Sequence, residues 1–333
     1  MRKCFAFLLV LSIPILKCFS QVPTTDIYLL DVKAKHGKFI FSNPQKISDW
    51  KGYNNQPYFT PDGKSIYYVS YRNKQSDIYR YDIDLKTTTQ FTNTPEDEYS
   101  PKLTPDGKYI SVVRVMKDSS QQLWEFPLDS GAPKHLLIGE DSIGYYCWTN
   151  SGIFTANVPE PMNIKKFDTS LIFNKTISNL KKTNQSTLYE RNAGRTLLDV
   201  KYKNFEEFFY VEKPVAKKDS IYSIHVFQRG EIKTVPIYIN TLPNCEDFAI
   251  GPKNTLFMGK NGKLYKCRIG VYMGKKGPIN KFGQDISLDK IGQDKEWIEI
   301  ADFSNTDYKN FYRIVFNKKG DKIALVSYQG KKP

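Results

Sequence analysis

Histidine is the scarcest residue in this chain, and its scarcity limits the chemistry that the chain can perform. Of 333 residues only three are histidines, His36, His135 and His225, and none has a neighbour at the spacing of a metal site. We interpret all three as ordinary strand or turn residues. No GxSxG motif opens a helix, and the glycines stand singly instead of forming a phosphate-binding loop. These absences argue against a zinc hydrolase, a serine hydrolase and a nucleotide-binding enzyme.

Cysteine is also rare. Three cysteines, Cys147, Cys245 and Cys267, follow the first twenty residues, and no pair has CxxC spacing. An odd number leaves at least one thiol free, so we expect buried free thiols on strands. The alternative is a single disulfide between Cys245 and Cys267, because disulfides persist in oxidising compartments.

Long apolar runs are absent except at the N-terminus. Arg2 and Lys3 precede an apolar stretch at Phe5–Leu16, which is shorter than the roughly 20 residues of a membrane span. This pattern predicts a signal peptide at residues 1–20, cleaved near Ser20, and a periplasmic or extracellular protein with no membrane span. Cys18 would permit a lipid anchor, but Lys17 stands where that processing requires a small residue. The remaining residues 21–333 are expected to form one domain and to be monomeric.

The chain is basic, with a formal charge of +14 that falls to about +11 when the charges of Arg2, Lys3 and Lys17 are removed. Lysine pairs are scattered along the chain, at Lys165–Lys166 and Lys275–Lys276 for example, and do not gather with aromatic residues. We interpret them as solvated turn and edge-strand charges, which block unwanted strand addition. The pattern argues against nucleic-acid binding and is compatible with an anionic polymer of the cell envelope.

What the chain does have is a repeat. The segment TPDGK occurs at Thr60–Lys64 and at Thr104–Lys108, 44 residues apart, each time between two runs of alternating apolar residues. Proline and aspartate suit the first turn positions, and glycine takes the left-handed conformation that closes a hairpin. A period near 45 residues with four short strands per unit is typical of a β-propeller blade.

Following this period predicts an all-β fold, a six-bladed β-propeller. Two blades start near residues 55 and 99, a third keeps its spacing through Gly152, and two more centre on Gly194–Val200 and Glu246–Pro252. Tyr312–Ser327 supplies only two strands, and the missing two are expected at the N-terminus, in residues 26–32 and 38–47. Together the two ends would complete the sixth blade and close the ring. Residues 169–186 and 270–294 are expected to be long surface loops.

The repeats at Gln56–Ser70 and Ser100–Arg114 resemble those of TolB-like six-bladed propellers, whose blades carry SPxxSPDGKxIxFxS motifs and share WD40-like architecture. Thr241–Gly259 and Trp297–Phe303 also resemble exported TolB-like proteins of Bacteroidetes-type bacteria. The resemblance implies a periplasmic or exported propeller that binds other proteins or envelope components without catalysing a reaction. TolB has an additional N-terminal domain, for which residues 21–26 leave no room, so membership of the same complex does not follow.

Propeller ligands commonly bind where the loops that enter each innermost strand converge on the axis. These positions predict a mixed-charge mouth suited to recognising a peptide or a glycan, in which tyrosine and arginine often dominate binding. Its predicted ligand-binding residues are Asn54, Glu98, Tyr99, Asp141, Tyr145, Arg195, Glu246, Asp247 and Arg313.

We therefore expect a noncatalytic exported propeller that binds a protein or an envelope glycan at its channel mouth, with no cofactor. One alternative is a propeller enzyme, a calcium-dependent lactonase or a polysaccharide lyase, with Glu98, Asp141, Glu246 and Asp247 supplying the carboxylates. Another is a scaffold that assembles with its partners independently of the mouth.

Overall fold

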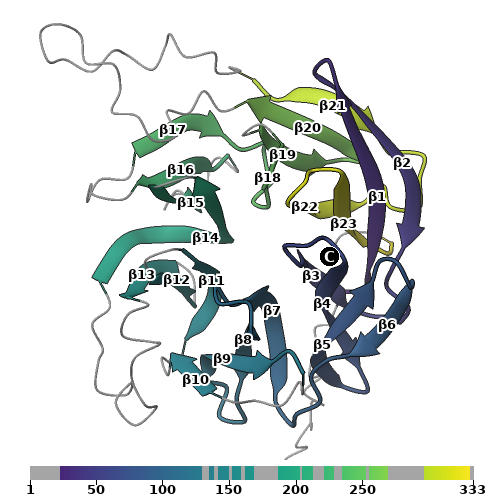
Figure 1. Ribbon diagram of the computed structural model, residues 1–333. Helices are drawn as coiled ribbons and strands as arrows, with labels where there is room; N and C mark the ends of the chain where they lie inside the picture. Colours follow the sequence, from purple (N-terminus) through teal and green to yellow (C-terminus); the bar gives the residue numbers. More distant parts are fainter. Residues whose placement is uncertain are drawn as a thin grey trace, which may run out of the picture.

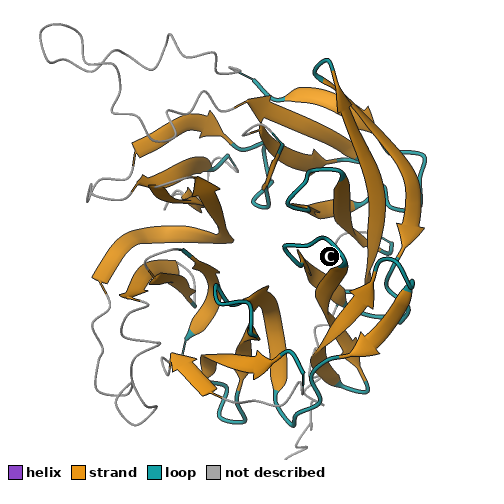
Figure 2. Ribbon diagram, in the orientation of Figure 1, coloured by secondary structure: helices purple, strands orange, loops and turns teal. Residues whose placement is uncertain are grey.

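Twenty-three β-strands arranged radially around one axis make up the fold in the part of the chain that the computed structural model describes (Figure 1). That part comprises residues 23–129, 135–138, 142–149, 152–158, 162–168, 187–202, 205–212, 221–228, 235–252, 255–268 and 296–330. It consists of strands and loops and contains no α-helix (Figure 2). Within it, no helix is long and apolar enough to cross a membrane. The predicted signal peptide and both predicted long loops lie outside the described residues.

The two TPDGK repeats form two four-stranded antiparallel sheets, as predicted. In the first sheet, hydrogen bonds join the strands in the order β3-β4-β5-β6, and in the second the order is β7-β8-β9-β10. The eight strands are β3 (Asn54–Phe59), β4 (Ser65–Arg72), β5 (Gln75–Asp82), β6 (Thr87–Gln90), β7 (Asp97–Leu103), β8 (Tyr109–Val115), β9 (Gln121–Pro127) and β10 (His135–Ile138).

The TPDGK turn has the geometry that its sequence predicts. Gly63 and Gly107 both have φ of 72°, the left-handed region that favours glycine. The Asp62 carboxylate accepts hydrogen bonds from the Thr60 hydroxyl at 2.6 Å and from the Lys64 backbone N–H at 3.0 Å. The hydrogen bond from Thr60, followed by that from Lys64, lowers the pKa of Asp62 below its ordinary value. The turn therefore satisfies its own polar groups.

The two ends of the chain complete one sheet, which confirms the predicted ring closure. This closing sheet has the order β2-β1-β23-β22, with β1 (Thr25–Lys35) and β2 (Lys38–Lys46) from the N-terminus and β22 (Phe311–Phe316) and β23 (Lys322–Tyr328) from the C-terminus. β1 and β23 pair without interruption from Thr25↔Tyr328 to Asp31↔Lys322.

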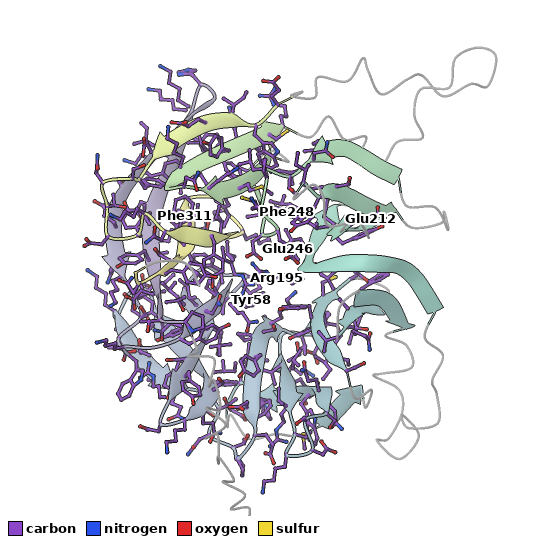
Figure 3. All side chains as sticks on the ribbon, turned by 180° about the vertical axis from the view of Figure 1, so that it is seen from behind. Tyr58, Arg195, Glu212, Glu246, Phe248 and Phe311 are labelled. Atoms are coloured by element: carbon purple, nitrogen blue, oxygen red, sulfur yellow. The ribbon has the colours of Figure 1, made fainter. Side chains whose placement is uncertain are left out.

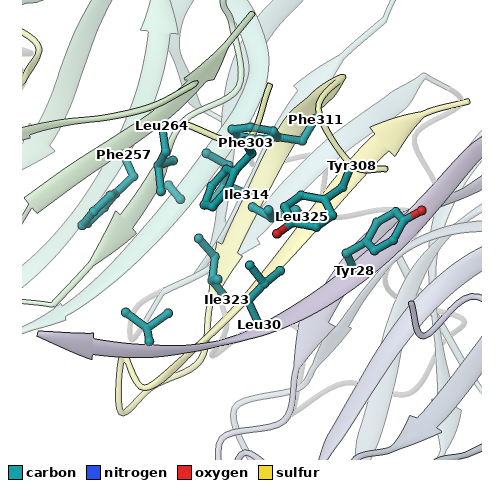
Figure 4. Close-up of a cluster of buried hydrophobic side chains, with 12 residues drawn as sticks. Tyr28, Leu30, Phe257, Leu264, Phe303, Tyr308, Phe311, Ile314, Ile323 and Leu325 are labelled. Carbon is teal, nitrogen blue, oxygen red and sulfur yellow. The ribbon is translucent and has the colours of Figure 1, made fainter. Parts of the chain in front are cut away.

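Alternate side chains of β1 enter two different hydrophobic cores, because successive side chains of a strand point to opposite faces. Ile27 and Leu29 pack with Tyr68 and other residues of the β3–β6 sheet. Tyr28 and Leu30 lie in the opposite core, where Tyr28 packs against Tyr308, and this core extends to Phe257 of the next sheet (Figure 4). The N-terminal strand thus supports both neighbours of the closing sheet.

Blades three and four do not form separate sheets, and this differs from the expectation of six sheets. The described residues form five sheets, because one has seven strands: β11 (Ile143–Trp148), β12 (Gly152–Asn157), β13 (Met162–Asp168), β14 (Thr187–Tyr202), β15 (Phe205–Glu212), β16 (Ser223–Gln228) and β17 (Val235–Asn240). β14 causes the fusion. Its first half pairs with β13 up to Ala193, and from Ala193 onward it pairs with β15.

The seven-stranded sheet nevertheless folds back on itself. Cys147 and Phe154 from its first half pack against Leu197 and Tyr210 from β14 and β15, as facing sheets do elsewhere in the ring. The six predicted units are therefore represented by five hydrogen-bonded sheets, with β14 shared between the third and fourth units.

The fifth sheet follows the prediction and has the order β18-β19-β20-β21. Its strands are β18 (Ala249–Gly251), β19 (Thr255–Lys260), β20 (Lys263–Arg268) and β21 (Ile298–Asp302). Cys267 on β20 is buried, as is Cys147, and Cys245 lies just before β18. The alternative disulfide between Cys245 and Cys267 is not formed in the structure.

Candidate functional site

The innermost strands of the ring share an irregularity that determines what points toward the axis. In its pairing with the strand that follows it, each of five inner strands shifts register at one place, and such bulges bend a strand and redirect its side chains. The shifts lie between Asn55 and Tyr58 in β3, Tyr99 and Lys102 in β7, Ile143 and Tyr145 in β11, Ala193 and Leu197 in β14, and Phe311 and Arg313 in β22. Three predicted mouth residues, Tyr145, Arg195 and Arg313, lie at these bulges.

Two of the bulges also carry unusual backbone geometry. Gln56 and Ser100 occupy equivalent positions, 44 residues apart, with φ of 53° and 56°. Left-handed φ values are uncommon outside glycine and concentrate where function requires a particular geometry. The Gln56 side chain accepts a hydrogen bond from the Ser100 backbone N–H at 2.7 Å, which joins the two neighbouring inner strands.

The bulges surround a cavity of about 130 Å³ at the axis. Viewed from behind, Tyr58, Arg195, Glu246 and Phe248 lie close to the centre of the ring (Figure 3). The wall combines aromatic rings, amides and charged groups, and includes Gln56, Tyr58, Ser100, Lys102, Tyr145, Arg195, Asp247, Phe248 and Arg313.

Asp247 is the centre of the charged part of this wall. Arg195 donates two hydrogen bonds to its carboxylate, Nε to Oδ1 at 3.1 Å and Nη2 to Oδ2 at 2.6 Å. Arg313 Nη2 approaches Oδ1 at 3.4 Å, and the Thr196 hydroxyl donates to the same oxygen at 3.2 Å. Burial alone would raise the pKa of Asp247, but Arg313 and Arg195 outweigh it and hold that pKa below its ordinary value. Asp247 is therefore ionised at neutral pH.

Hydrogen bonds extend this arrangement to neighbouring strands. The Glu246 carboxylate accepts a hydrogen bond from the Arg195 backbone N–H. On the other side, Arg313 Nη1 donates to the Asn55 Oδ1 at 2.9 Å, and Asn55 Nδ2 donates to the hydroxyl oxygens of Tyr312 at 2.7 Å and Tyr53 at 2.9 Å. Burial raises the pKa of Tyr53 to about 12, so this phenol is neutral. We call Arg195, Glu246, Asp247, Arg313 and Asn55 the mouth network.

The mouth network leaves donors available to a ligand. The Arg195 side chain is 34% exposed. Its Nε and Nη2 bond to Asp247, whereas its Nη1 forms no hydrogen bond with any residue in the described part of the chain. Asp247 raises the pKa of Arg195 despite partial burial, so the guanidinium stays charged. Tyr145 beside it keeps its proton, since burial raises its pKa. A fixed cation beside phenol groups suits ligands with carbonyl, hydroxyl or carboxylate oxygens.

The structure places three other predicted residues outside this network. Asn54 is fully buried, and its side chain donates to the backbone oxygens of Thr25 at 2.9 Å and Trp50 at 2.8 Å. It thereby attaches β3 to the N-terminal strand. Glu98 is also fully buried and lies between two sheets. The hydroxyl of Tyr99 accepts a hydrogen bond from Ser76 at 3.0 Å and does not line the cavity. Asp141 lies outside the described residues.

Several wall residues were not selected from the sequence. Gln56, Tyr58, Ser100 and Lys102 follow the entry loops by a few residues and reach the axis because of the bulges. A bulge at a non-glycine residue has no clear sequence pattern, so this contribution was missed. Thr196 could have been found, since it directly follows Arg195.

No metal cluster is evident in the portion of the chain that can be described. There, no group of three or more histidine, cysteine, aspartate or glutamate residues is arranged to hold a metal ion.

Comparison with known proteins relates the fold to TolB-like propellers. TolB from Acinetobacter baumannii superimposes with a TM-score of 0.52 at 15% identity, over 73% of this chain and 60% of that one. A candidate TolB from Agrobacterium tumefaciens gives a TM-score of 0.54 at 10% identity, over 93% of this chain and 99% of that one. At such identities the likeness concerns the fold alone.

Sequence comparison finds less. No protein-family model matches the chain. An uncharacterised protein of Agrobacterium fabrum is 29% identical over 89 residues, which amount to 27% of this chain and 28% of that protein. The chain thus matches under a third of the length of this relative.

Proposed function

We propose that this protein is a noncatalytic, exported β-propeller that binds a protein or a cell-envelope glycan at the axial mouth formed by its inner strands. The observation that carries the proposal is the mouth network, in which two arginines, two carboxylates and neutral phenols converge beside a cavity. A concave wall of aromatic groups with a few fixed polar groups is the usual form of a binding site.

The state of Asp247, the central carboxylate of the mouth network, supports binding better than acid–base catalysis. A general acid or base needs a pKa near the working pH and a free oxygen within reach of the substrate. Asp247 has neither property, because its pKa is lowered and both of its oxygens accept hydrogen bonds from Arg195 or Thr196. The Nη1 group of Arg195, in contrast, can donate hydrogen bonds to a ligand without any change of protonation.

The test is a binding comparison on the mature chain, residues 21–333. Wild type, Arg195→Ala and a control, Arg80→Ala, are immobilised and exposed to envelope extract, a glycan array and a peptide array. Arg80 is the matched control because it lies on β5 away from the cavity with 46% of its side chain exposed. All three proteins must first show equal circular dichroism spectra at the assay temperature, well below the melting temperature of the least stable variant.

We expect the same ligand to be retained by wild type and by Arg80→Ala and to bind at least about tenfold more weakly to Arg195→Ala, as truncation of a central arginine commonly produces. Equal retention by all three proteins would contradict binding at the mouth and favour a scaffold that assembles through another surface. The glycan and peptide arrays distinguish the two ligand classes.

Calcium distinguishes this proposal from a calcium-dependent enzyme. A ligand that binds only the folded state of a protein raises the melting temperature of that protein. We expect the same melting temperature in millimolar calcium and in chelator, whereas a clear increase with calcium would favour the enzyme and lead to a lactone and uronide substrate screen.

A further inference from the structure

The contact between the β3–β6 sheet and the β7–β10 sheet buries two carboxyl groups together. Asp77 on β5 is 5% exposed, and Glu98 on β7 is fully buried. The two side chains lie within hydrogen-bonding reach of each other. Two ionised carboxylates in buried contact repel one another, so such pairs commonly hold a proton.

The hydrogen bonds of this pair are incomplete in a specific way. Asp77 Oδ2 accepts from Gln90 Nε2 at 3.2 Å, and Glu98 Oε1 accepts from the Thr94 hydroxyl. The other oxygen of each group, Asp77 Oδ1 and Glu98 Oε2, has no hydrogen-bond partner among the described residues. A buried acceptor without a partner is costly. A proton held by one carboxyl group and donated to the other would lessen this cost.

The nearest cation, Arg114, does not supply the missing hydrogen bonds of this pair. Arg114 on β8 forms an ion pair with Glu98, Nε to Oε1 at 3.4 Å, and lowers the pKa of Glu98, but burial outweighs it and this Nε forms no hydrogen bond. Its guanidinium instead stacks over the Trp124 ring at 4.8 Å, and its Nη2 pairs with Glu96.

The other charged and titratable groups near the pair are acidic or phenolic. Asp97 on β7 adds negative charge, although its carboxylate is engaged by the Ser76 backbone N–H at 2.7 Å. Tyr99 on the same strand and Tyr79 on β5 also interact electrostatically with the pair, and burial keeps both phenols neutral by raising their pKa. The surroundings therefore favour retention of the proton.

We propose that Asp77 and Glu98 share one proton and form a pH-sensitive lock between these two sheets. With the proton present, each carboxyl group completes the hydrogen bonds of the other across the interface. When hydroxide or buffer removes the proton to solvent, two negative charges remain in contact and the interface loosens. This lock does not depend on the proposed binding function.

The direction of the pH effect follows from the protonation states. Burial raises the pKa of Asp77 to about 6 and that of Glu98 to about 8. The folded chain therefore holds a proton that the unfolded chain has lost above its ordinary carboxyl pKa. Stability from this pair is complete below the ordinary carboxyl pKa of about 4 and is lost as the pH rises through the folded-state pKa values of about 6 and about 8.

Melting temperatures of wild type, Glu98→Gln and Asp77→Asn between pH 5 and pH 9 test the lock. The amide N–H of glutamine or asparagine can donate the hydrogen bond that the shared proton supplies, and it does not titrate. The melting temperature of either variant should therefore stay nearly constant over this range, while that of the wild type falls as the pH rises. Glu299→Gln, an exposed glutamate on β21, is the control and should fall with the wild type. Parallel curves for wild type and Glu98→Gln would overturn the proposal.

A second measurement does not depend on comparing variants that fold equally well. At pH 7 in dilute buffer with an indicator dye, unfolding of the wild type should release about one proton from the pair. Release of no proton would overturn the lock. A wild-type melting temperature that rises with calcium, but does not rise in Glu98→Gln, would also overturn it, because a metal ion would then occupy the place of the proton.

Discussion

Replacing Asp247 by asparagine should destabilise the protein strongly, because Asp247 pairs with both arginines, whereas Glu246 lies 3.9 Å from Arg195 alone. Asparagine has nearly the same shape and can still accept from Thr196, but it removes the negative charge that Arg195 and Arg313 face at 2.6 Å and 3.4 Å. Breaking a buried ion pair by removing one partner typically costs about 3–5 kcal/mol. Arg195 is 34% exposed and can regain water, so we expect the lower end, about 3 kcal/mol.

Urea denaturation followed by circular dichroism measures this loss as a lower midpoint. A change of about 3 kcal/mol corresponds to a fall in melting temperature of roughly 4–5 °C, because the unfolding entropy is about 2.1 cal/mol/K per residue and the chain exceeds 300 residues. Asp302→Asn is the matched control, since Asp302 forms an exposed pair with Lys263 and its replacement should change the stability little. If Asp247→Asn cost no more than this control, the mouth network would not be the ion-paired centre that we describe.

Two further predictions concern the ring and its turns. Removing residues 21–48, which contain β1 and β2, should abolish the cooperative thermal transition, because β1 contributes buried side chains to both cores beside the closing sheet. An unchanged transition would contradict ring closure. Gly107→Ala should lower the free energy of unfolding by about 1 kcal/mol, because alanine does not favour a φ of 72°. Gly320→Ala has a similar φ of 71° and also places a methyl group 2.2 Å from Pro252, so it should cost at least about 1 kcal/mol more. Urea denaturation measures both costs, and equal values would contradict the close packing of Gly320 against Pro252.

Much of the fold could be predicted because its repeat is local. The TPDGK turn needs glycine at one position, and the strands on either side alternate between two buried faces, so spacing and period are both visible in the sequence. Ring closure followed from counting strands at the two ends. The fusion of the third and fourth units could not be predicted, because β14 changes its pairing partner near Ala193 within one continuous strand.

The site was predictable only in part. Arg195, Asp247 and Arg313 were found because each stands at the entrance to an inner strand, and the structure joins them in one network. Asn54 and Glu98 occupy the same kind of position but point into buried contacts, and whether a side chain faces the axis or a neighbouring sheet depends on the bulge beside it. Asp77 was missed because it lies on the third strand of its sheet, where only packing with Glu98 reveals it.

Hydrogen–deuterium exchange with mass spectrometry tests the central claim, that ligands bind at the axial mouth. Residues 21–333 are measured alone and with the ligand that the wild-type column retains. We expect slower exchange in the inner-strand segments 54–59, 97–103, 193–198 and 311–316, with the outer strands β2, β6 and β21 unchanged. Protection confined to the outer strands would contradict a binding site at the mouth.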